Sequence, residues 1–311
     1  MKIAVLGGGG GLGRNVVDAA LAVGHDVSVL VRDPQRAALP SSVAIVVGDA
    51  TREDDVVRVM EGAAATVFCV NPPFGTWLST FPPLLDTAIL AAKRTGTRLI
   101  FPANVWIYGP GPRGALISET RAPSATSKRG ALRARMEQQI RDAGIRHVMI
   151  RLPEFYGPHV TTLTARAFRA ALDSKRTLWP GPLEVEVELV YMPDAARALV
   201  TVATAVGCDA DVFHLPGTPT RPREFLEKIY AVAGSKPRMS SVPGWMLSLA
   251  GMFDATARGA ADIDHVWTFP VLLDGTRYRA RFGEVPRTPL DDAIATTLAW
   301  HRARPALRMQ G

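Results

Sequence analysis

Short apolar runs alternate with segments of helical periodicity through the first half of the chain. After the first run, Leu12, Val16 and Val17 recur at helical spacing until Gly24 ends the segment. Strands that alternate with helices are typical of a parallel sheet with crossover helices, and strands this apolar need cover on both faces. The expected strands lie at residues 3–6, 27–31, 43–47, 66–70, 99–101 and 147–152, and the expected helices near residues 12–23, 56–60, 84–92 and 125–143.

The regularity weakens after residue 153. Residues 185–191 and 212–215 still resemble strands, helices are expected at 194–206, 223–233 and 290–302, and residues 242–290 are mixed. The pattern therefore predicts an α/β fold with a doubly wound parallel sheet in residues 1–155, completed by part of residues 185–216. Residues 156–311 are expected to form a smaller, discontinuous, mixed α/β region that binds the substrate.

The turn after the first strand carries Gly7, Gly10 and Gly13 in GxxGxxG spacing. The first glycine allows a tight turn, the second lets the backbone approach a pyrophosphate, and the third lets the helix pack close to the strand. The amides of Gly11 and Leu12, at the helix start, would face the phosphates. A glycine-rich turn without a ligand is the alternative, but the strand before and the helix after favour a Rossmann-type NAD(P)-binding domain.

The end of the second strand bears on the choice of cofactor. An acidic residue at this place usually holds the ribose hydroxyls of NAD, whereas an arginine can accept the additional phosphate of NADP. Arg32 comes first here and Asp33 follows it, before Pro34. We therefore predict NADP, with NAD as the alternative. The alternative without a cofactor role is that Arg32 is a surface arginine and Asp33 a turn residue.

Two further strand ends are expected to line the cofactor crevice. Asp49 and Ala50 follow the third strand, where an aspartate can bond the adenine amine or cap the next helix. Val70, Asn71 and Pro72 follow the fourth strand and place small or rigid residues at the crevice, although a plain loop is the alternative.

Composition narrows the class of protein. The 311 residues are 47% hydrophobic and 21% charged, which is ordinary for a globular protein of one large domain or two smaller ones. No apolar run reaches the ~18 residues of a membrane span and no signal-peptide pattern opens the chain, so we expect a cytoplasmic protein without membrane contact. The net charge is +7, but the arginines are scattered, which argues against nucleic acid as a partner. The spacing of cysteines and histidines favours no metal site.

Together these motifs resemble the short-chain dehydrogenase/reductase superfamily, and the length resembles its extended branch, the NAD-dependent epimerase/dehydratase family. The resemblance covers residues 1–235 well and the remainder loosely. It implies an enzyme that uses NAD(P) on a small carbonyl or hydroxyl compound or on a nucleotide sugar. The matching stretches are Gly7–Gly13, residues 31–34, residues 48–50, Ile107-Tyr108-Gly109, residues 151–158 and residues 191–197.

The catalytic pattern of that family is incomplete in this chain. The family uses a Tyr followed four residues later by a Lys, with a Ser or Thr upstream, because the Lys lowers the Tyr pKa for acid–base work. None of the five tyrosines here has a Lys four residues on. By position Arg129 replaces the Tyr, Arg133 the Lys and Asn104 the Ser or Thr. An arginine keeps its charge and its donors but does not exchange a proton as lysine does.

The resemblance still supplies catalytic candidates, namely Asn104, Tyr108, Arg133 and Tyr156. Either tyrosine would replace the missing acid if it faced the nicotinamide; a structural role beside the following glycine is the alternative. Arg133 is also expected to hold ribose hydroxyls or a phosphate. The matching stretch at 151–158 adds Pro153 and Phe155 to the expected cofactor contacts.

Three functions compete at this point. The favoured one is an NAD(P)-dependent oxidoreductase or epimerase with a non-standard proton donor. The second is an NADP-binding sensor or regulator of the NmrA type, which the missing Tyr and Lys would suit. A nucleic-acid binder comes last. We expect a monomer or a homodimer, since helix 125–143 lies where extended members of the superfamily pair.

Overall fold

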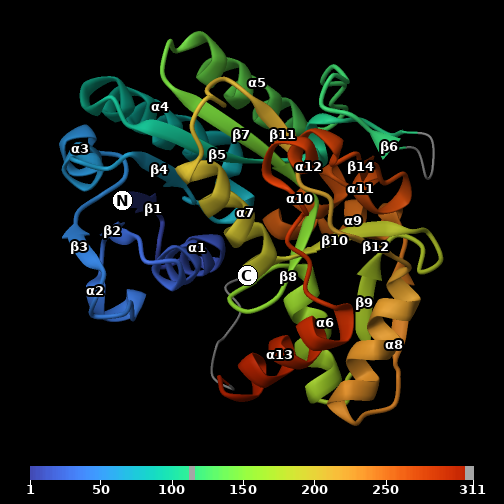
Figure 1. Ribbon diagram of the computed structural model, residues 1–311. Helices are drawn as coiled ribbons and strands as arrows, with labels where there is room; N and C mark the ends of the chain where they lie inside the picture. The colour runs from blue at the N-terminus through green and yellow to red at the C-terminus, as the bar shows by residue number, and fades with distance from the viewer. Residues whose placement is uncertain (112–115, 305–311) are drawn as a thin grey trace.

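The computed structural model describes residues 1–111 and 116–304. A parallel sheet of seven strands forms its centre, in the order β11-β7-β5-β4-β1-β2-β3 (Figure 1). This order reverses direction on the two sides of β1, as in a doubly wound nucleotide-binding sheet. The strands are β1 (Lys2–Leu6), β2 (Asp26–Val31), β3 (Ala44–Val47), β4 (Ala65–Phe68), β5 (Arg98–Asn104), β7 (His147–Leu152) and β11 (Val212–His214).

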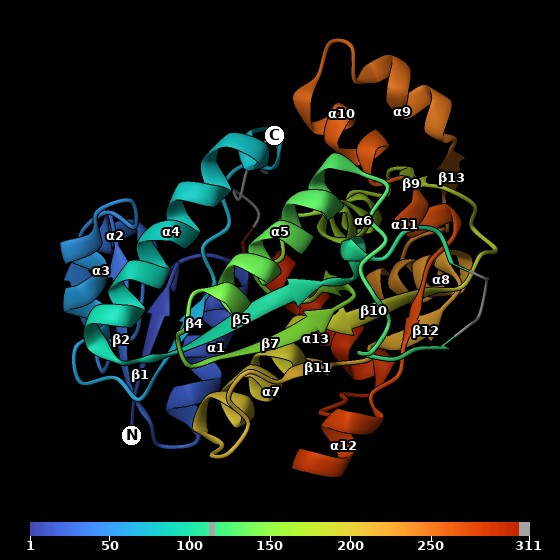
Figure 2. The same ribbon diagram turned by 90° about the horizontal axis from the view of Figure 1, so that it is seen from above.

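The alternation of side chains along β1 divides the interior into two cores. Ala4 and Leu6 belong to one core and Ile3 and Val5 to the other, because successive residues of a strand point to opposite faces. Helices α3, α4 and α5 cover the first face, and α1 and α7 cover the second (Figure 2). The helices of this domain are α1 (Gly11–Ala22), α2 (Pro34–Ala37), α3 (Glu53–Met60), α4 (Trp77–Thr95), α5 (Lys128–Asp142) and α7 (Met192–Thr204), with short 3-10 helices η1 (Phe74–Thr76) and η2 (Val105–Ile107).

The predicted α/β class and doubly wound parallel sheet are confirmed, with two differences of detail. Helix α4 begins at Trp77 and runs through Pro82 and Pro83, before the predicted start at residue 84. Prolines remove helix N–H bonds, but Trp77 anchors this first part, because its ring stacks on Phe81 at 5.0 Å and its Nε1 donates to the Pro72 carbonyl. Within residues 185–216, only β11 joins the main sheet; the strand at Val187–Tyr191 belongs to a second sheet.

The second region is assembled from segments that are far apart in sequence. Its three-stranded sheet has the order β12-β10-β8, and two strand pairs, β13-β9 and β14-β6, complete it. Tyr156, Phe168 and Phe225 pack together beneath this sheet. Its elements are β6 (Leu116–Ile117), β8 (Glu154–Tyr156), α6 (Leu163–Leu172), β9 (Thr177–Pro180), β10 (Val187–Tyr191), β12 (Thr218–Thr220), α8 (Pro222–Ala233), β13 (Met239–Val242), α9 (Gly244–Ala250), α10 (Ala255–Asp262), α11 (His265–Thr268), β14 (Leu272–Leu273), α12 (Thr276–Phe282) and α13 (Leu290–Arg302).

Membrane-spanning helices and clusters of metal-binding side chains are both absent from the described residues. No helix in residues 1–111 and 116–304 has the length and apolar character needed to cross a bilayer. The same residues contain no group of three or more His, Cys, Asp or Glu side chains that could hold a metal ion.

Candidate functional site

The glycine loop after β1 leads into a helix without a side-chain cap. Gly7 has a positive φ of 81°, and its carbonyl accepts the N–H of Gly10 at 3.0 Å. A Cβ atom on Gly13 would lie 2.2 Å from the Gly7 carbonyl oxygen, so only glycine allows this approach of α1 to β1. Gly10 is the N-cap of α1 and has no side chain to bond the first-turn amides, which stay available for an anion.

A second loop packs against the start of α1. Asn15 Nδ2 donates to the carbonyls of Gly11 at 2.9 Å and Pro158 at 3.1 Å. A Cβ on Gly11 would lie 2.7 Å from the His159 carbonyl oxygen. Leu12 also packs with Phe155 on one small hydrophobic cluster. The structure therefore brings the predicted cofactor residues Gly11, Leu12 and Phe155 together, although they come from distant parts of the chain.

The ends of β2 and β3 form the other flank of the glycine loop. Arg32 is exposed there, whereas Asp33 Oδ1 accepts the N–H of Gln35 at 3.0 Å and starts α2. Asp49 Oδ1 accepts both the N–H and the hydroxyl of Thr51 at 2.8 Å. These hydrogen bonds, and to a smaller extent the charge of Arg32, lower the pKa of Asp49. This flank therefore offers an exposed cation next to an ionised carboxylate.

Residues between the glycine loop and β5 continue the crevice. A Cβ on Gly7 would lie 2.8 Å from the Cys69 carbonyl oxygen, so the loop after β4 touches the glycine loop. Val70 and Ala50 are half-buried and pack against the core, Asn71 is exposed, and Pro72 is held by Trp77.

These strand ends lie at one edge of the sheet, where ligands of doubly wound folds bind. The open glycine loop fits a pyrophosphate, and Arg32 fits the adenosine half beyond it, over β2 and β3. The nicotinamide half would then extend the other way, over the ends of β4, β5 and β7. The described residues thus suit a dinucleotide. Its reacting nicotinamide end would lie near Asn104 and Pro153.

Helix α5 carries two buried arginines, Arg129 and Arg133, where the sequence predicts the family's Tyr and Lys positions. Arg133 Nη2 donates to the Pro102 carbonyl, and its guanidinium lies over the Phe101 ring at 4.6 Å. Burial lowers the pKa of Arg133 to about 10, which still leaves it charged at neutral pH. Arg129 Nη1 pairs with Asp262 at 3.3 Å. Neither side chain is therefore a proton donor, and both hold neighbouring elements.

Asn104 and the two tyrosine candidates also make structural contacts. Asn104 Oδ1 accepts the N–H of Trp106 at 3.2 Å and caps η2. The Tyr108 hydroxyl lies 2.7 Å from His214 Nε2 and accepts a bond from Arg151 at 2.5 Å. Burial raises the pKa of Tyr108 to about 12. Tyr156 is 1% exposed, and burial raises its pKa as well. Both tyrosines thus hold their protons strongly in the interior.

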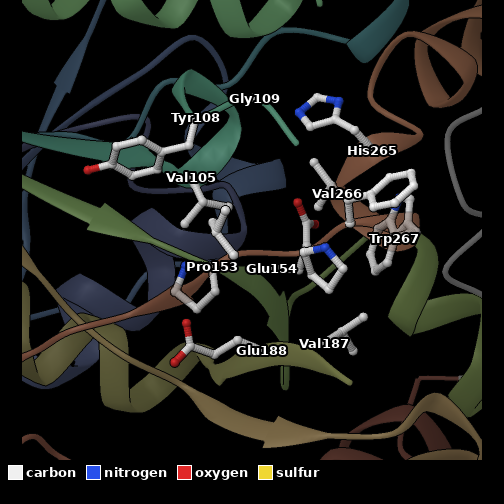
Figure 3. Close-up of a pocket in the computed structure, with 13 residues that line it drawn as sticks. Val105, Tyr108, Gly109, Pro153, Glu154, Val187, Glu188, His265, Val266 and Trp267 are labelled. Carbon is white, nitrogen blue, oxygen red and sulfur yellow. The ribbon is translucent and has the colours of Figure 1, made fainter. Parts of the chain in front are cut away.

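A small cavity lies beyond the ends of β5 and β7, between them and α11 (Figure 3). Its volume of about 20 Å³ has room for one water molecule. Most of its wall is apolar. The lining residues are Val105, Tyr108, Gly109, Pro153, Glu154, Val187, Glu188, His265, Val266, Trp267, Phe269, Pro270 and Val271.

Glu154 and His265 are the polar groups that face each other in this cavity. Figure 3 shows the Glu154 carboxyl turned toward the His265 ring. Trp106 Nε1 donates to Glu154 Oε1 at 2.7 Å, but burial outweighs this bond and raises the pKa of Glu154 to about 7. Burial lowers the pKa of His265. The cavity therefore joins an acid that is partly protonated at neutral pH to a neutral imidazole.

Glu188 lines the cavity but turns its carboxyl to the other side of Pro153 (Figure 3). There it accepts the N–H of Leu273 at 3.0 Å, and burial raises its pKa to about 8. The sequence analysis named none of Glu154, Glu188 and His265. Glu154 could have been noticed, because it is an acidic residue two positions after a fully buried strand.

Comparisons with known proteins show the family and the fold of this chain. A model of a family described as NAD(P)H-binding matches residues 7–172, which is more than half of the chain. A curated relative from a Streptomyces species, 3-diazoavenalumate denitrifying reductase, is 27% identical over 293 residues, covering 84% of this chain and 92% of the relative.

Solved structures with a similar fold bind NAD or nucleotide sugars. A dTDP-glucose 4,6-dehydratase from Streptomyces venezuelae, with NAD bound, has a TM-score of 0.80 at 19% identity, covering 98% of each chain. A UDP-glucose 4-epimerase from Thermotoga maritima, with UDP-glucose, has a TM-score of 0.79 at 18% identity, covering 98% of this chain and 100% of that one. The resemblance expected from the motifs is confirmed, and this chain belongs to the NAD(P)H-binding family.

Proposed function

We propose that this protein is an NADPH-dependent reductase of a small, neutral, conjugated acceptor. The observation that carries the proposal is the open glycine loop with an exposed arginine beside it. Arg32 is free to meet the additional phosphate of NADP, whereas Asp33 already caps α2. NAD remains the alternative cofactor.

The apolar lining of the cavity supports a conjugated acceptor rather than a nucleotide sugar, with only the small reacting group of that acceptor entering the volume of about 20 Å³. Trp267 and Phe269 form part of this wall, and Glu154 and His265 are its polar groups. The name of the Streptomyces relative indicates reduction of a diazo compound by that protein. We therefore propose a carbonyl or diazo compound with an aromatic or conjugated body as the substrate class. When bound, the nicotinamide would supply a hydride to it.

The chain's own residues then have four tasks. The amides of Gly11 and Leu12 would hold the pyrophosphate, and Arg133 would hold ribose hydroxyls or a phosphate of the cofactor. The apolar cavity wall would exclude water from the acceptor. Because a neutral acceptor also needs a proton, one of the buried acids must supply it.

Calorimetric titration with NADPH and NADH tests the cofactor. We expect NADPH to bind at least tenfold more tightly than NADH, and Arg32→Ala to remove most of that preference, because the arginine contacts only the additional phosphate. Arg135→Ala, which alters an exposed arginine of α5, is the control and should bind NADPH like the wild type. Equal affinity of the wild type for both nucleotides would contradict the assignment of NADP.

Two other functions have specific support. Epimerisation of a nucleotide sugar is supported by the fold shared with UDP-glucose 4-epimerase. A non-catalytic sensor of the NmrA type is supported by the buried arginines at the Tyr and Lys positions. Adding an aryl diazo compound or a quinone to the NADPH complex, and UDP-glucose to the complex with NAD+ or NADP+, separates them, since a sensor oxidises no NADPH and an epimerase converts only the sugar.

A further inference from the structure

We propose that Glu154 delivers the proton in the reductive step and that His265, on the opposite wall of the cavity, returns one to it. This inference rests on the proposed reductase function. It gives the acid role to a residue outside the family's Tyr and Lys positions, on a strand end instead of on α5.

The position of Glu154 at the end of β7 supports its role as the acid. Asn104 of β5 pairs with Leu152 of β7, so these two strands end side by side. Pro153 and Glu154 follow Leu152 directly and therefore lie at the carboxyl edge of the sheet, on the same edge as the glycine loop. A dinucleotide held at that loop, with its adenosine half toward Arg32, would place the reacting end near Glu154.

The bonding of Glu154 leaves one carboxyl oxygen for a proton. An indole N–H can only donate, so Glu154 Oε1 is an acceptor toward Trp106. The second oxygen can then carry the acidic hydrogen. No cationic side chain in the described residues offsets a charge on Glu154. Arg129 and Arg151 are paired with other carboxylates, Arg129 with Asp262 and Arg151 with Glu137.

His265 provides the second polar wall. The Tyr108 backbone accepts a hydrogen bond from its ring, which leaves the other nitrogen as an acceptor. That nitrogen, Nε2, is buried and meets no hydrogen-bond partner among residues 1–111 and 116–304. A buried acceptor without a partner is costly, and a cavity of about 20 Å³ has room for the water that would satisfy it. Such a water would connect His265 to Glu154.

The other titratable groups around the cavity do not compete for this role. The Tyr108 hydroxyl is held by His214 and Arg151, away from the cavity. The Glu188 carboxyl accepts the Leu273 amide beyond Pro153. Glu154 is therefore the acid that the reacting group of an acceptor would meet in the cavity.

The step balances with these groups. Reduction of a neutral acceptor forms two bonds: one to the hydride from NADPH and one to the proton from Glu154, whose O–H bond breaks. A carbonyl becomes an alcohol, and a diazo carbon gains both hydrogens as N₂ leaves. The Glu154 carboxylate then takes a proton from water, relayed by His265, which returns the site to its starting state.

The first experiment measures the protonation of Glu154 in the absence of catalytic turnover. Trp106 donates to Glu154, so its fluorescence should follow the protonation of the carboxyl. We expect a transition with a midpoint near pH 7 in the wild type, absent in Glu154→Gln and in Trp106→Phe. Glu188→Gln, which alters the other buried acid, should leave that transition in place. A transition that persists in Glu154→Gln, or none in the wild type, would overturn the acid site.

The second experiment measures NADPH oxidation with an accepted diazo or carbonyl compound. We expect kcat to fall above pH 7 in the wild type and to be about 10²-fold lower in Glu154→Gln, with the Kd for NADPH unchanged. Formate should partly restore the activity of Glu154→Ala, because a small acid fits the vacated space. A Glu154→Gln enzyme within threefold of the wild type, with the same pH profile, would refute the proposal and leave the reductase function standing.

The two proposals fail separately. If the wild type binds NADPH but reduces none of the acceptors, the reductase function is refuted, and the fluorescence titration still decides whether Glu154 holds an exchangeable proton.

Discussion

Single residues of this molecule show how burial sets protonation. Glu154 and Glu188 are acids whose pKa values burial raises, whereas His214 is an imidazole whose pKa burial lowers to about 4. The neutral form is favoured in each case, because a charge in an apolar interior loses its hydration. His214 Nδ1 donates to the Ile117 carbonyl, so its Nε2 accepts the Tyr108 hydroxyl. These residues contribute stability only while they remain uncharged.

Glu188 makes this contribution measurable. Its folded pKa of about 8 exceeds the ordinary glutamate pKa of 4.5, so the stability it provides is complete below pH 4.5 and is lost as the pH rises through 8. Gln cannot ionise. At pH 9 we therefore expect Glu188→Gln to be more stable than the wild type by about 2 kcal/mol. This free energy is smaller than the one that the whole pKa shift of Glu188 would give.

Urea unfolding at pH 6 and pH 9 measures the free energy difference. Glu184→Gln, at an exposed glutamate paired with Arg223, serves as the control and should lose stability between pH 6 and pH 9 as the wild type does, because it retains Glu188. The same decline in stability between pH 6 and pH 9 for wild type and Glu188→Gln would contradict this account of Glu188.

At the scale of elements, helix α10 is attached to the start of α5 by one carboxylate. Asp262, at the end of α10, accepts the N–H groups of Lys128 and Arg129 at 3.0 Å each. It thus satisfies first-turn amides of α5 from another part of the chain. Next to this contact, a Cβ on Gly259 would lie 2.4 Å from the Phe74 ring, so α10 also packs closely on η1. Residues far apart in sequence hold this side of the substrate region together.

Removing the charge of Asp262 should loosen that attachment. We expect Asp262→Asn to lower the free energy of unfolding by about 1–2 kcal/mol, because a charge-assisted cap is lost. We also expect faster proteolysis within residues 244–262. Asp173→Asn, at an exposed residue paired with Lys175, should change stability by less than about 0.5 kcal/mol. Proteolysis of Asp262→Asn at the wild-type rate would show that α10 is held by other contacts.

The elements also show how far the sequence predicts the structure. The strand at 147–152 is predicted with the observed bounds, because it is a continuous buried run that starts after Gly144. The start of α4 is not predicted correctly, because Pro82 and Pro83 argue against a helix in the sequence. The aromatic stacking that stabilises this helix is seen only in the structure. The cavity could not be predicted either. It needs Glu154 and His265 on the wall of one cavity, and only the tertiary assembly of the second region brings these distant residues to it.

At the scale of the whole molecule, the glycine loop belongs to the first domain, but one wall of it comes from residues 158–159. NADPH binding should therefore be detected in both regions. In hydrogen exchange we expect saturating NADPH to slow exchange at residues 7–14 and at residues 158–161, because both segments lose mobility when the site is filled.

Helix α9, at the outer part of the second region, is the internal control for that experiment (Figure 2). Its exchange should be unchanged by NADPH. Protection confined to residues 7–14 would mean that the loop at residues 158–161 does not respond to the cofactor. The oligomeric state, expected to be a monomer or a homodimer, remains a prediction that light scattering can test.

The side-chain amide of Asn15 links any change in cofactor preference to the substrate site. It ties the glycine loop to Pro158, four residues beyond Glu154 along the same segment. A substitution that reshapes the loop for another nucleotide will therefore also displace the acid that meets the substrate. An engineer who wishes to exchange the cofactor must expect the substrate range to change with it, since the two preferences share one support.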